Sequence, residues 1–433
     1  MTLNALGHGL GSRGDLPIPL WQFTWAATAA LVISFLALGI SWQQPKLTFL
    51  EQGRPLKTLS KSVKVIEPVA RVLSLVLFLL VLTAGLFGTN ASDQNLNPVT
   101  IYVIFWVVLQ ILVCFLGDIW KVLSPFDTIG ILVERSRSTN PKEAPLWSHW
   151  FAPIGAFGFL FFELIHPSGD SPFLLSIGIL IYSFCLMIGV YLWGRDWLKD
   201  GDSFAVHFRL LAQMAPIYRR QKSIHLRFPL SGLSSSRFTN AEVATLLIIL
   251  GGVTFDGFGE SEMWRDLVGR KSDWANAAAR LFGLVDSIAV IALLFLISVR
   301  FMANITDQKP GLLAKTFAPS LVPIVFGYTL AHYLQLAIDE SQTFVFQLSD
   351  PFGNGWDLFG GTGNRINFNL INPSFIAWVQ AIGVVIGHIA GVIVAHDRAV
   401  SSFPEKDAVR SQYVMFLVMV VYSILGLWLL LNA

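Results

Sequence analysis

Two apolar segments decide the fold, APSLVPIVFGYTLAHYLQLAIDE (residues 318–340) and FIAWVQAIGVVIGHIAGVIVAHDRAV (residues 375–400). In the first segment polar residues recur at steps of three and four positions, and an α-helix places such residues on one face. The residues of this face are Tyr328, His332, Gln335 and Asp339. Because a helix this apolar has little water around it, we expect the histidine and the carboxylate to have protein partners or a function.

The second segment carries a stripe of glycines, Gly383, Gly387 and Gly391, with His388 beside it. A stripe of small residues lets the backbone of another helix approach closely. We therefore predict that this stripe packs against a helix of the same chain or of a partner.

Composition places the chain in a membrane. Of its 433 residues, 54% are hydrophobic and only 13% are charged, whereas a soluble domain has about 25% charged residues. The net charge of +2 gives no reason to expect a nucleic-acid partner. The two cysteines, Cys114 and Cys185, lie in apolar runs, so neither a disulfide nor a CxxC metal site is expected.

Apolar runs of about 20 residues, long enough to cross ~30 Å of hydrocarbon, recur along the chain. They predict an all-α integral membrane protein, a single domain over residues 1–433 with about ten transmembrane helices. The runs lie near residues 18–41, 70–88, 99–120, 148–166, 172–194, 240–257, 277–302, 317–338, 374–396 and 411–432. Gly251 and Gly252 interrupt the sixth run, which makes it the weakest of the set.

The connections between these runs predict the orientation. Residues 42–68, 120–146 and 195–238 are rich in Lys and Arg, whereas residues 89–98 and 167–171 contain neither. Short loops rich in Lys and Arg stay in the cytoplasm. Both termini are therefore predicted on the extracytoplasmic side.

Three segments outside the runs are singled out. Residues 1–17 form an extracytoplasmic N-terminal segment. Within residues 195–238, a helix capped by Asp202 or Ser203 has an apolar face, which predicts an interfacial helix on the cytoplasmic leaflet. Residues 339–373 form an extracytoplasmic loop whose length is typical of lids and binding elements.

With this orientation the polar groups sort into two layers. The outer layer contains His8, Asp15, Glu163, His166, Asp256, Asp286, His332 and Asp339, and the inner layer contains Asp118, His388, His396 and Asp397. Imidazole and carboxylate groups suit a divalent metal, and neighbouring carboxylates repel each other unless a cation or a partner compensates them. We therefore expect the outer groups either to hold a metal or to be paired singly in structural hydrogen bonds.

Three interpretations of these groups stay open. In an enzyme, a metal held by His332, Asp256, Asp286 and His8 activates water, with Asp339 or Glu163 as the base. In a transporter or channel for a small solute or ion, the polar groups line a path on both sides of the membrane midplane. In a scaffolding subunit of a membrane complex, the glycine stripe carries the function.

Five further motifs carry a resemblance to known proteins. They are HGLGSRGDLPIP (8–19), LGDIWKVLSPF (116–126), GYTLAHY (327–333), LSDPFGNGWDLFG (348–360) and GHIAGVIVAHDRAV (387–400). Over nearly its whole length the chain resembles a family of bacterial polytopic membrane proteins labelled fenitrothion hydrolase or hypothetical membrane protein. The resemblance implies an enzyme of the bacterial cytoplasmic (inner) membrane that hydrolyses organophosphate (phosphotriester) esters. We expect zinc or copper as the metal, and a second membrane subunit or a second copy of the chain as a partner beside the lipid bilayer.

Overall fold

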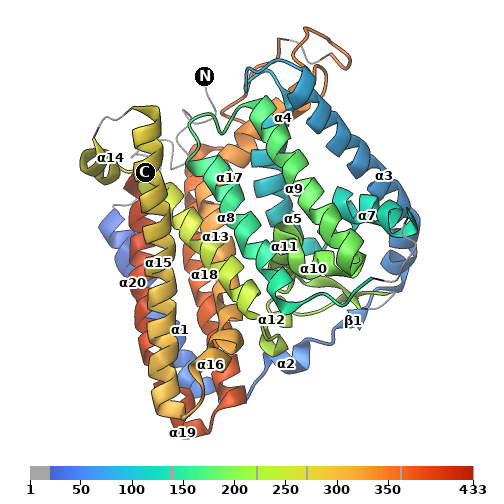
Figure 1. The fold of residues 1–433 in the computed structure, drawn as a ribbon. Helices are drawn as coiled ribbons and strands as arrows, with labels where there is room; N and C mark the ends of the chain where they lie inside the picture. Colours follow the sequence, from blue (N-terminus) through green and yellow to red (C-terminus); the bar gives the residue numbers. More distant parts are fainter. Residues whose placement is uncertain (1–19, 137–140, 221–222, 270–271, 361–362, 433) are drawn as a thin grey trace.

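The computed structural model describes residues 20–136, 141–220, 223–269, 272–360 and 363–432. This part of the chain is almost wholly helical, with its long helices side by side, α15 and α20 at one edge and α3 at the other (Figure 1). Within it, nine helical segments are long and apolar enough to cross a membrane. They are Trp21–Ser41, Lys61–Phe87, Leu96–Leu116, Pro172–Trp193, Asn240–Gly259, Asp273–Thr306, Pro310–Gln347, Pro373–Ser402 and Glu405–Leu429. The prediction of an almost wholly helical chain with several apolar helices of membrane-spanning length is confirmed, as expected of a multi-pass membrane protein.

The long helices are α1 (Leu20–Ser41), α3 (Lys57–Phe87), α9 (Pro172–Trp193), α13 (Asn240–Gly259), α15 (Asp273–Thr306), α17 (Val322–Gln347), α18 (Pro373–Ser402) and α20 (Tyr413–Asn432). A further span is composite, from α4 (Leu96–Val99) through the π-helix η2 (Thr100–Val108) to α5 (Leu109–Leu116). The expected span near 148–166 is the shorter helix α8 (Phe151–Leu164), preceded by η3 (Leu146–Trp150). The remaining short helices are α2 (Leu47–Leu50), α6 (Trp120–Leu123), α7 (Pro125–Ser136), η4 (Arg195–Trp197), α10 (Leu198–Gly201), α11 (Ser203–Ala212), α12 (Gly232–Ser235), α14 (Glu262–Val268), α16 (Pro310–Phe317), η5 (Ala318–Leu321), α19 (Glu405–Ala408) and η6 (Arg410–Gln412).

A small antiparallel sheet, which the sequence did not predict, joins two of the basic connections. Its strands are β1 (Arg54–Pro55), β2 (Ile217–Arg220) and β3 (Ser223–Leu226), in the order β1-β3-β2. In this register Leu226 lies opposite both Arg54 and Ile217. The sheet therefore brings the connections after the first and after the fifth predicted spans to the same end of the helix bundle.

The glycine stripe packs against another helix of the same chain, which is one of the two outcomes predicted. A Cβ atom added to Gly387 would lie 2.7 Å from the Pro323 carbonyl oxygen and 3.0 Å from the Gly327 Cα atom. One added to Gly391 would lie 2.8 Å from the Ser320 carbonyl oxygen. Helices α17 and α18 thus cross backbone against backbone, so this stripe is not a free surface for another subunit.

The glycines of the sixth span are also contact points and do not break the helix. Helix α13 is continuous, and most of it is buried. A Cβ atom on Gly251 would lie 2.6 Å from the Ile288 Cα atom of α15, and one on Gly252 would lie 2.5 Å from Leu160 Cδ1 of α8. These glycines let α8 and α15 approach α13 closely, which places α13 at the centre of the site described below.

Two predicted surface segments differ in the structure. Asp202 does cap α11, accepting a hydrogen bond from the Phe204 N–H at 3.0 Å. However, Val206, His207 and Leu210, which lie outside the expected apolar face, are also buried. Helix α11 is thus packed inside the protein and does not form the exposed interfacial helix that was predicted.

The second difference concerns the predicted loop 339–373. Helix α17 continues through Gln347, so the connection to α18 is shorter and spans residues 348–372. The extra turns are held by their polar side chains, because Gln347 Nε2 donates to the Asp93 carbonyl oxygen at 2.9 Å and Gln342 Oε1 accepts from the Asn367 N–H at 3.0 Å.

Candidate functional site

An acid-lined cavity of about 320 Å³ lies where α8 and α13 end and α15 begins. Its ionisable and hydroxyl side chains include Glu163 of α8, Asp256 of α13, Glu260 at the C-cap of α13, Arg280 of α15, and Tyr102 and Tyr333. We call this space the acidic cavity. It lies at the opposite end of α13 from the three-stranded sheet, since the sheet directly precedes that helix and the cavity surrounds its last residues.

Asp256 forms the centre of the wall. Tyr333 donates its hydroxyl hydrogen to Asp256 Oδ2 at 2.6 Å, and His332 Nε2 lies 2.9 Å from the same oxygen. His332 does not line the cavity and is only 2% exposed, so it contacts Asp256 from behind the wall. The expected proximity of His332 and Asp256 is present, and Tyr333, which was not predicted, completes the group.

Tyr333 follows His332 on α17. Both side chains reach the carboxylate of Asp256 on α13, because it lies between the directions in which they point. Residues next to each other on a helix point about 100° apart at 3.6 residues per turn. The helical face of Tyr328, His332, Gln335 and Asp339 therefore does not include Tyr333. The motif GYTLAHY contained the only available signal, a hydroxyl group beside the histidine.

Arg280 brings a positive charge to this acidic wall. Its Nη2 lies 3.3 Å from Glu260 Oε1, and its Nε donates to the Leu164 carbonyl oxygen at 2.7 Å. Sequence reasoning missed this arginine. The available signal was its position near the end of a span predicted to be extracytoplasmic, where the bias of Lys and Arg toward the cytoplasm disfavours a basic residue.

Two carboxyl groups of the cavity differ in their surroundings. Glu163 Oε2 is buried and has no hydrogen-bond partner among the described residues. Glu260 lies beyond the end of the membrane-spanning part of α13. Burial raises the pKa of Glu260 above its ordinary value and the charge of Asp256 raises it further, whereas the charge of Arg280 acts in the opposite direction.

The other predicted site residues do not join this cavity. Asp286 is exposed on α15. Asp339 is buried farther along α17 and accepts a hydrogen bond from Gln335 Nε2 at 2.6 Å, but it does not line the cavity. His8 and Asp15 lie outside the described residues.

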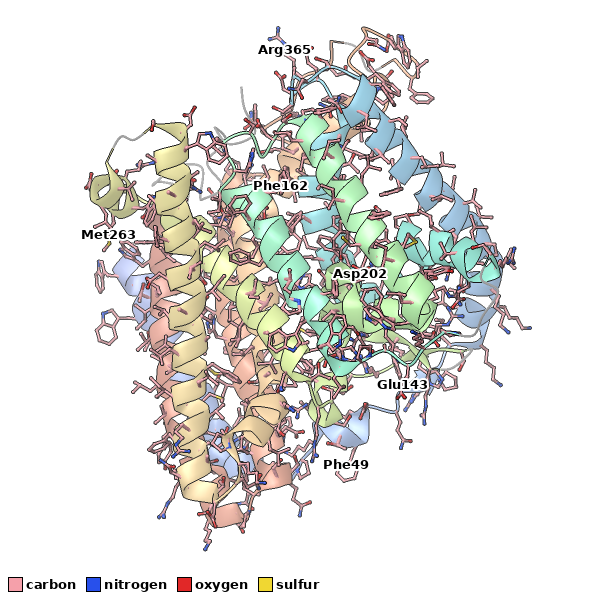
Figure 2. The ribbon with its side chains drawn as sticks, viewed as in Figure 1. Phe49, Glu143, Phe162, Asp202, Met263 and Arg365 are labelled. Atoms are coloured by element: carbon pink, nitrogen blue, oxygen red, sulfur yellow. The ribbon has the colours of Figure 1, made fainter. Side chains whose placement is uncertain are left out.

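Figure 2 shows toward which end of the molecule the acidic cavity lies. It labels Phe162, which precedes the cavity residue Glu163. Phe162 lies closer to the end of the molecule with Arg365 than to the end with Phe49.

Two of the inner-layer groups, His396 and Asp397, connect helices. Asp397 Oδ1 accepts hydrogen bonds from Trp42 Nε1 at 2.9 Å and from the backbone N–H groups of Lys46 at 2.6 Å and Leu47 at 3.1 Å. His396 Nε2 lies 3.0 Å from the Trp42 carbonyl oxygen, and Arg398 donates to the carbonyl oxygens of Leu233 and Ser236. These three residues fasten α18 to the connection after α1 and to α12.

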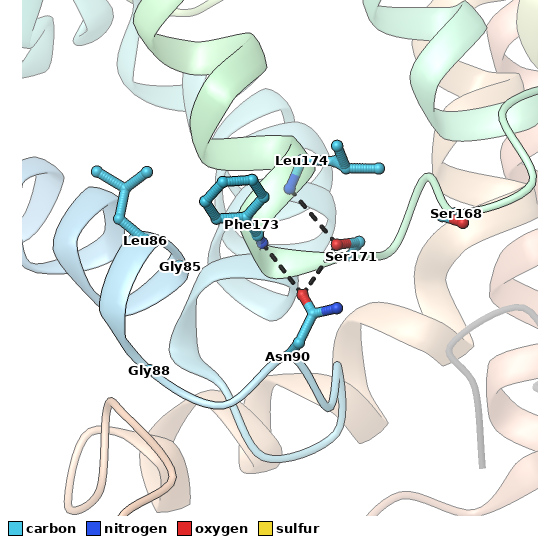
Figure 3. A pocket seen from close by; sticks show the side chains of 8 residues that line it. All are labelled: Gly85, Leu86, Gly88, Asn90, Ser168, Ser171, Phe173 and Leu174. Carbon is cyan, nitrogen blue, oxygen red and sulfur yellow. Dashed lines mark hydrogen bonds between the residues drawn. The ribbon is translucent and has the colours of Figure 1, made fainter.

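A second hollow, of about 430 Å³, lies between the end of α3 and the start of α9 (Figure 3). There Asn90 Oδ1 accepts hydrogen bonds from Ser171 Oγ at 2.9 Å and from the Phe173 N–H at 3.4 Å. Among the described residues, no ionisable side chain lines this hollow. Its polar groups hold the first turn of α9 and offer no acid or base.

In the part of the chain that the structure describes, no three His, Cys, Asp or Glu side chains come together to hold a metal ion. The expected zinc or copper stays a prediction, which metal analysis of the purified protein tests. Comparison of the chain with protein-family models, with curated proteins and with solved structures found no match.

Proposed function

We propose that this membrane protein is a hydrolase whose acidic cavity binds an ester at the extracytoplasmic end of the helix bundle. The observation that carries the proposal is the Asp256 carboxylate, which lines the cavity and is held by His332 and Tyr333. A carboxylate fixed in this way is suited to accept a proton from a water molecule as that water attacks an ester.

The distribution of polar groups favours an enzyme over a transporter. A transport path needs accessible polar groups on both sides of the membrane midplane. Here Glu163 and Asp256 of the outer layer line a cavity, whereas Asp397 and His396 of the inner layer are engaged in hydrogen bonds that fasten helices together. A scaffolding role has no support from the glycine stripe, because α17 covers it.

The other groups of the cavity fit an ester with a polar oxygen. Arg280 offers N–H groups and positive charge to a phosphoryl oxygen, which is the kind of recognition that guanidinium groups provide. Glu163 is a second carboxyl group on the same wall and is suited to exchange a proton with the leaving group. The substrate class, an organophosphate triester, rests on the resemblance of the sequence motifs. The proposal assigns no step to a metal, since the described residues do not form a metal site.

The distribution of charge supports an assignment of the two ends of the bundle to the two sides of the membrane. The end of the bundle with the sheet carries Arg54, Arg219 and Arg220, and the connections joined by that sheet are rich in Lys and Arg. The bias of such residues toward the cytoplasm supports a cytoplasmic position for the sheet and an extracytoplasmic position for the acidic cavity. In a bacterium, the cavity would then open toward the periplasmic side of the inner membrane.

Hydrolysis of a nitrophenyl phosphotriester by the purified full-length protein in lipid vesicles tests the proposal. We expect Asp256→Asn to lower kcat by about 10²–10⁴-fold, the range for loss of a general base. Asp339→Asn is the matched comparison, since it makes the same change at a buried residue of α17 that does not line the cavity, and we expect it to retain activity. Activity that survives Asp256→Asn, or no hydrolysis by the wild type, would overturn the proposal.

A further inference from the structure

Asp286 lies on the outward face of α15. The opposite face packs on the bundle through Leu284, Ile291 and Phe295, all of which are buried. Next to Asp286, Ser287 Oγ donates to the Gly251 carbonyl oxygen of α13 at 2.8 Å. Asp286 itself is exposed, and no described residue forms a hydrogen bond or an ion pair with it. Figure 1 shows α15 at the edge of the bundle, beside α20.

The depth of Asp286 follows from two exposed residues on the same helix. Trp274 is 67% exposed and belongs to a residue type that gathers at membrane surfaces, while Arg300 is exposed toward the other end. At 1.5 Å per residue, Asp286 lies ~18 Å from Trp274 and ~21 Å from Arg300 along the axis. Since the hydrocarbon layer is ~30 Å thick, the carboxyl group is near its middle.

A carboxyl group that faces lipid at this depth is unfavourable, and such residues face protein or water in membrane proteins. The side chains around it are large and apolar, with Phe282 77%, Val285 48% and Leu293 57% exposed. The face therefore combines an apolar surface for helix packing with one negative group at its centre, and a positive group in an apolar helix complements it.

We propose that this face of α15 binds a transmembrane helix of a different membrane protein, one that carries a Lys or Arg side chain near the middle of the membrane. A second copy of the chain fits less well. In a two-fold dimer with its axis along the membrane normal, α15 would meet its own copy and bring one Asp286 against the other. Two carboxylates at that depth repel each other.

Three synthetic single-span peptides of Leu and Ala, differing only in a central Lys, Leu or Glu, serve as probes. Energy transfer between each labelled peptide and the labelled full-length protein in phosphatidylcholine vesicles reports binding. We expect the Lys peptide to bind about tenfold tighter than the Leu peptide, the effect of one polar contact between membrane helices. Asp286→Leu should abolish this preference, and Val290→Leu, a neutral change on the same face, should retain it.

Asp286→Leu should fold, because leucine suits a position that faces lipid, and thermal unfolding in detergent checks this. Equal binding of the Lys and Leu peptides to the wild type, or a preference that survives Asp286→Leu, would overturn the proposal. A dimer would also overturn it, if single-molecule photobleaching counts two copies for the wild type and one for Asp286→Leu. That result would assign the face to a second copy of the chain. Ester hydrolysis is not part of this test, so its outcome is independent of the proposed function.

Discussion

Gly327 of α17 and Gly387 of α18 meet with only hydrogen atoms between their backbones, since a Cβ atom on Gly387 would lie 3.0 Å from the Gly327 Cα atom. This contact sets the distance between the two helices. His332 and Tyr333 follow Gly327 by about one and a half turns, so the same contact helps to place them against Asp256.

Substitution at Gly387 tests this contact. Gly387→Ala should destabilise the fold by about 1–3 kcal/mol, the usual cost of overpacking a core, and Gly387→Leu should lower the yield of folded protein further. Gly158→Ala in α8 is the control, because a Cβ atom there meets nothing within 4 Å. Thermal unfolding in detergent measures the difference. Equal effects at both glycines would show that α18 has room to move away from α17.

Tyr333→Phe removes one hydrogen bond from Asp256 and leaves the ring in place. We expect a loss of about 0.5–3 kcal/mol of stability, since the bond is buried and its acceptor is a carboxylate. Hydrolysis should also slow, because Asp256 loses a group that orients it. Tyr413→Phe at an exposed tyrosine of α20 provides the control and should change neither quantity. An unchanged rate in Tyr333→Phe would separate the tyrosine from the chemistry.

The pH dependence of stability should contain a contribution from Glu260. Its pKa is raised in the folded protein, mainly by burial, from an ordinary value of 4.5. The folded state therefore binds the proton more tightly than the unfolded state, and this stabilisation is full below pH 4.5. It is lost as the pH rises through the raised pKa. In unfolding experiments at successive pH values, Glu260→Gln should be less sensitive to pH than the wild type across that window. Parallel curves for the two proteins would contradict this assignment.

The sides of the membrane on which the two termini lie show whether α8 crosses it. With α8 and the nine longer apolar segments of the described chain all crossing the membrane, both termini lie on the same side, which the charge bias predicts to be extracytoplasmic. If α8 does not cross, the termini lie on opposite sides. We expect reporter fusions at Met1 and after Ala433 to place both ends outside the cytoplasm. A cytoplasmic signal from either fusion would refute the predicted topology.

What the sequence could predict depended on local patterns. The length of apolar runs and the spacing of Gly383, Gly387 and Gly391 are local, and both predicted the structure well. The contact of His332 with Asp256 was expected because both residues were placed at the same depth. Depth, however, does not give direction around a helix. Asp286 has a similar polar character but points away from the bundle, since the packed face of α15 is set by its contact with Gly251 of α13.

The missed features come from tertiary contacts. The pairing of Arg54 with Leu226 joins strands too short to have a sequence signal. The burial of α11 depends on the helices that surround it, and an amphipathic pattern alone cannot separate a membrane surface from a protein interior. Arg280 had no motif and Tyr333 lay off the predicted helical face, and the acidic cavity brings the two side chains together.

The bond between Asp397 and the Lys46 N–H joins residues 351 positions apart, and it has a consequence for biosynthesis. A ribosome adding 5–20 residues per second needs about 20–70 s to reach the second partner after the first has emerged. During that time the first helix is in the bilayer without its permanent attachment. Assembly of this protein should therefore depend on the insertion machinery or a chaperone to retain α1 until α18 has been synthesised.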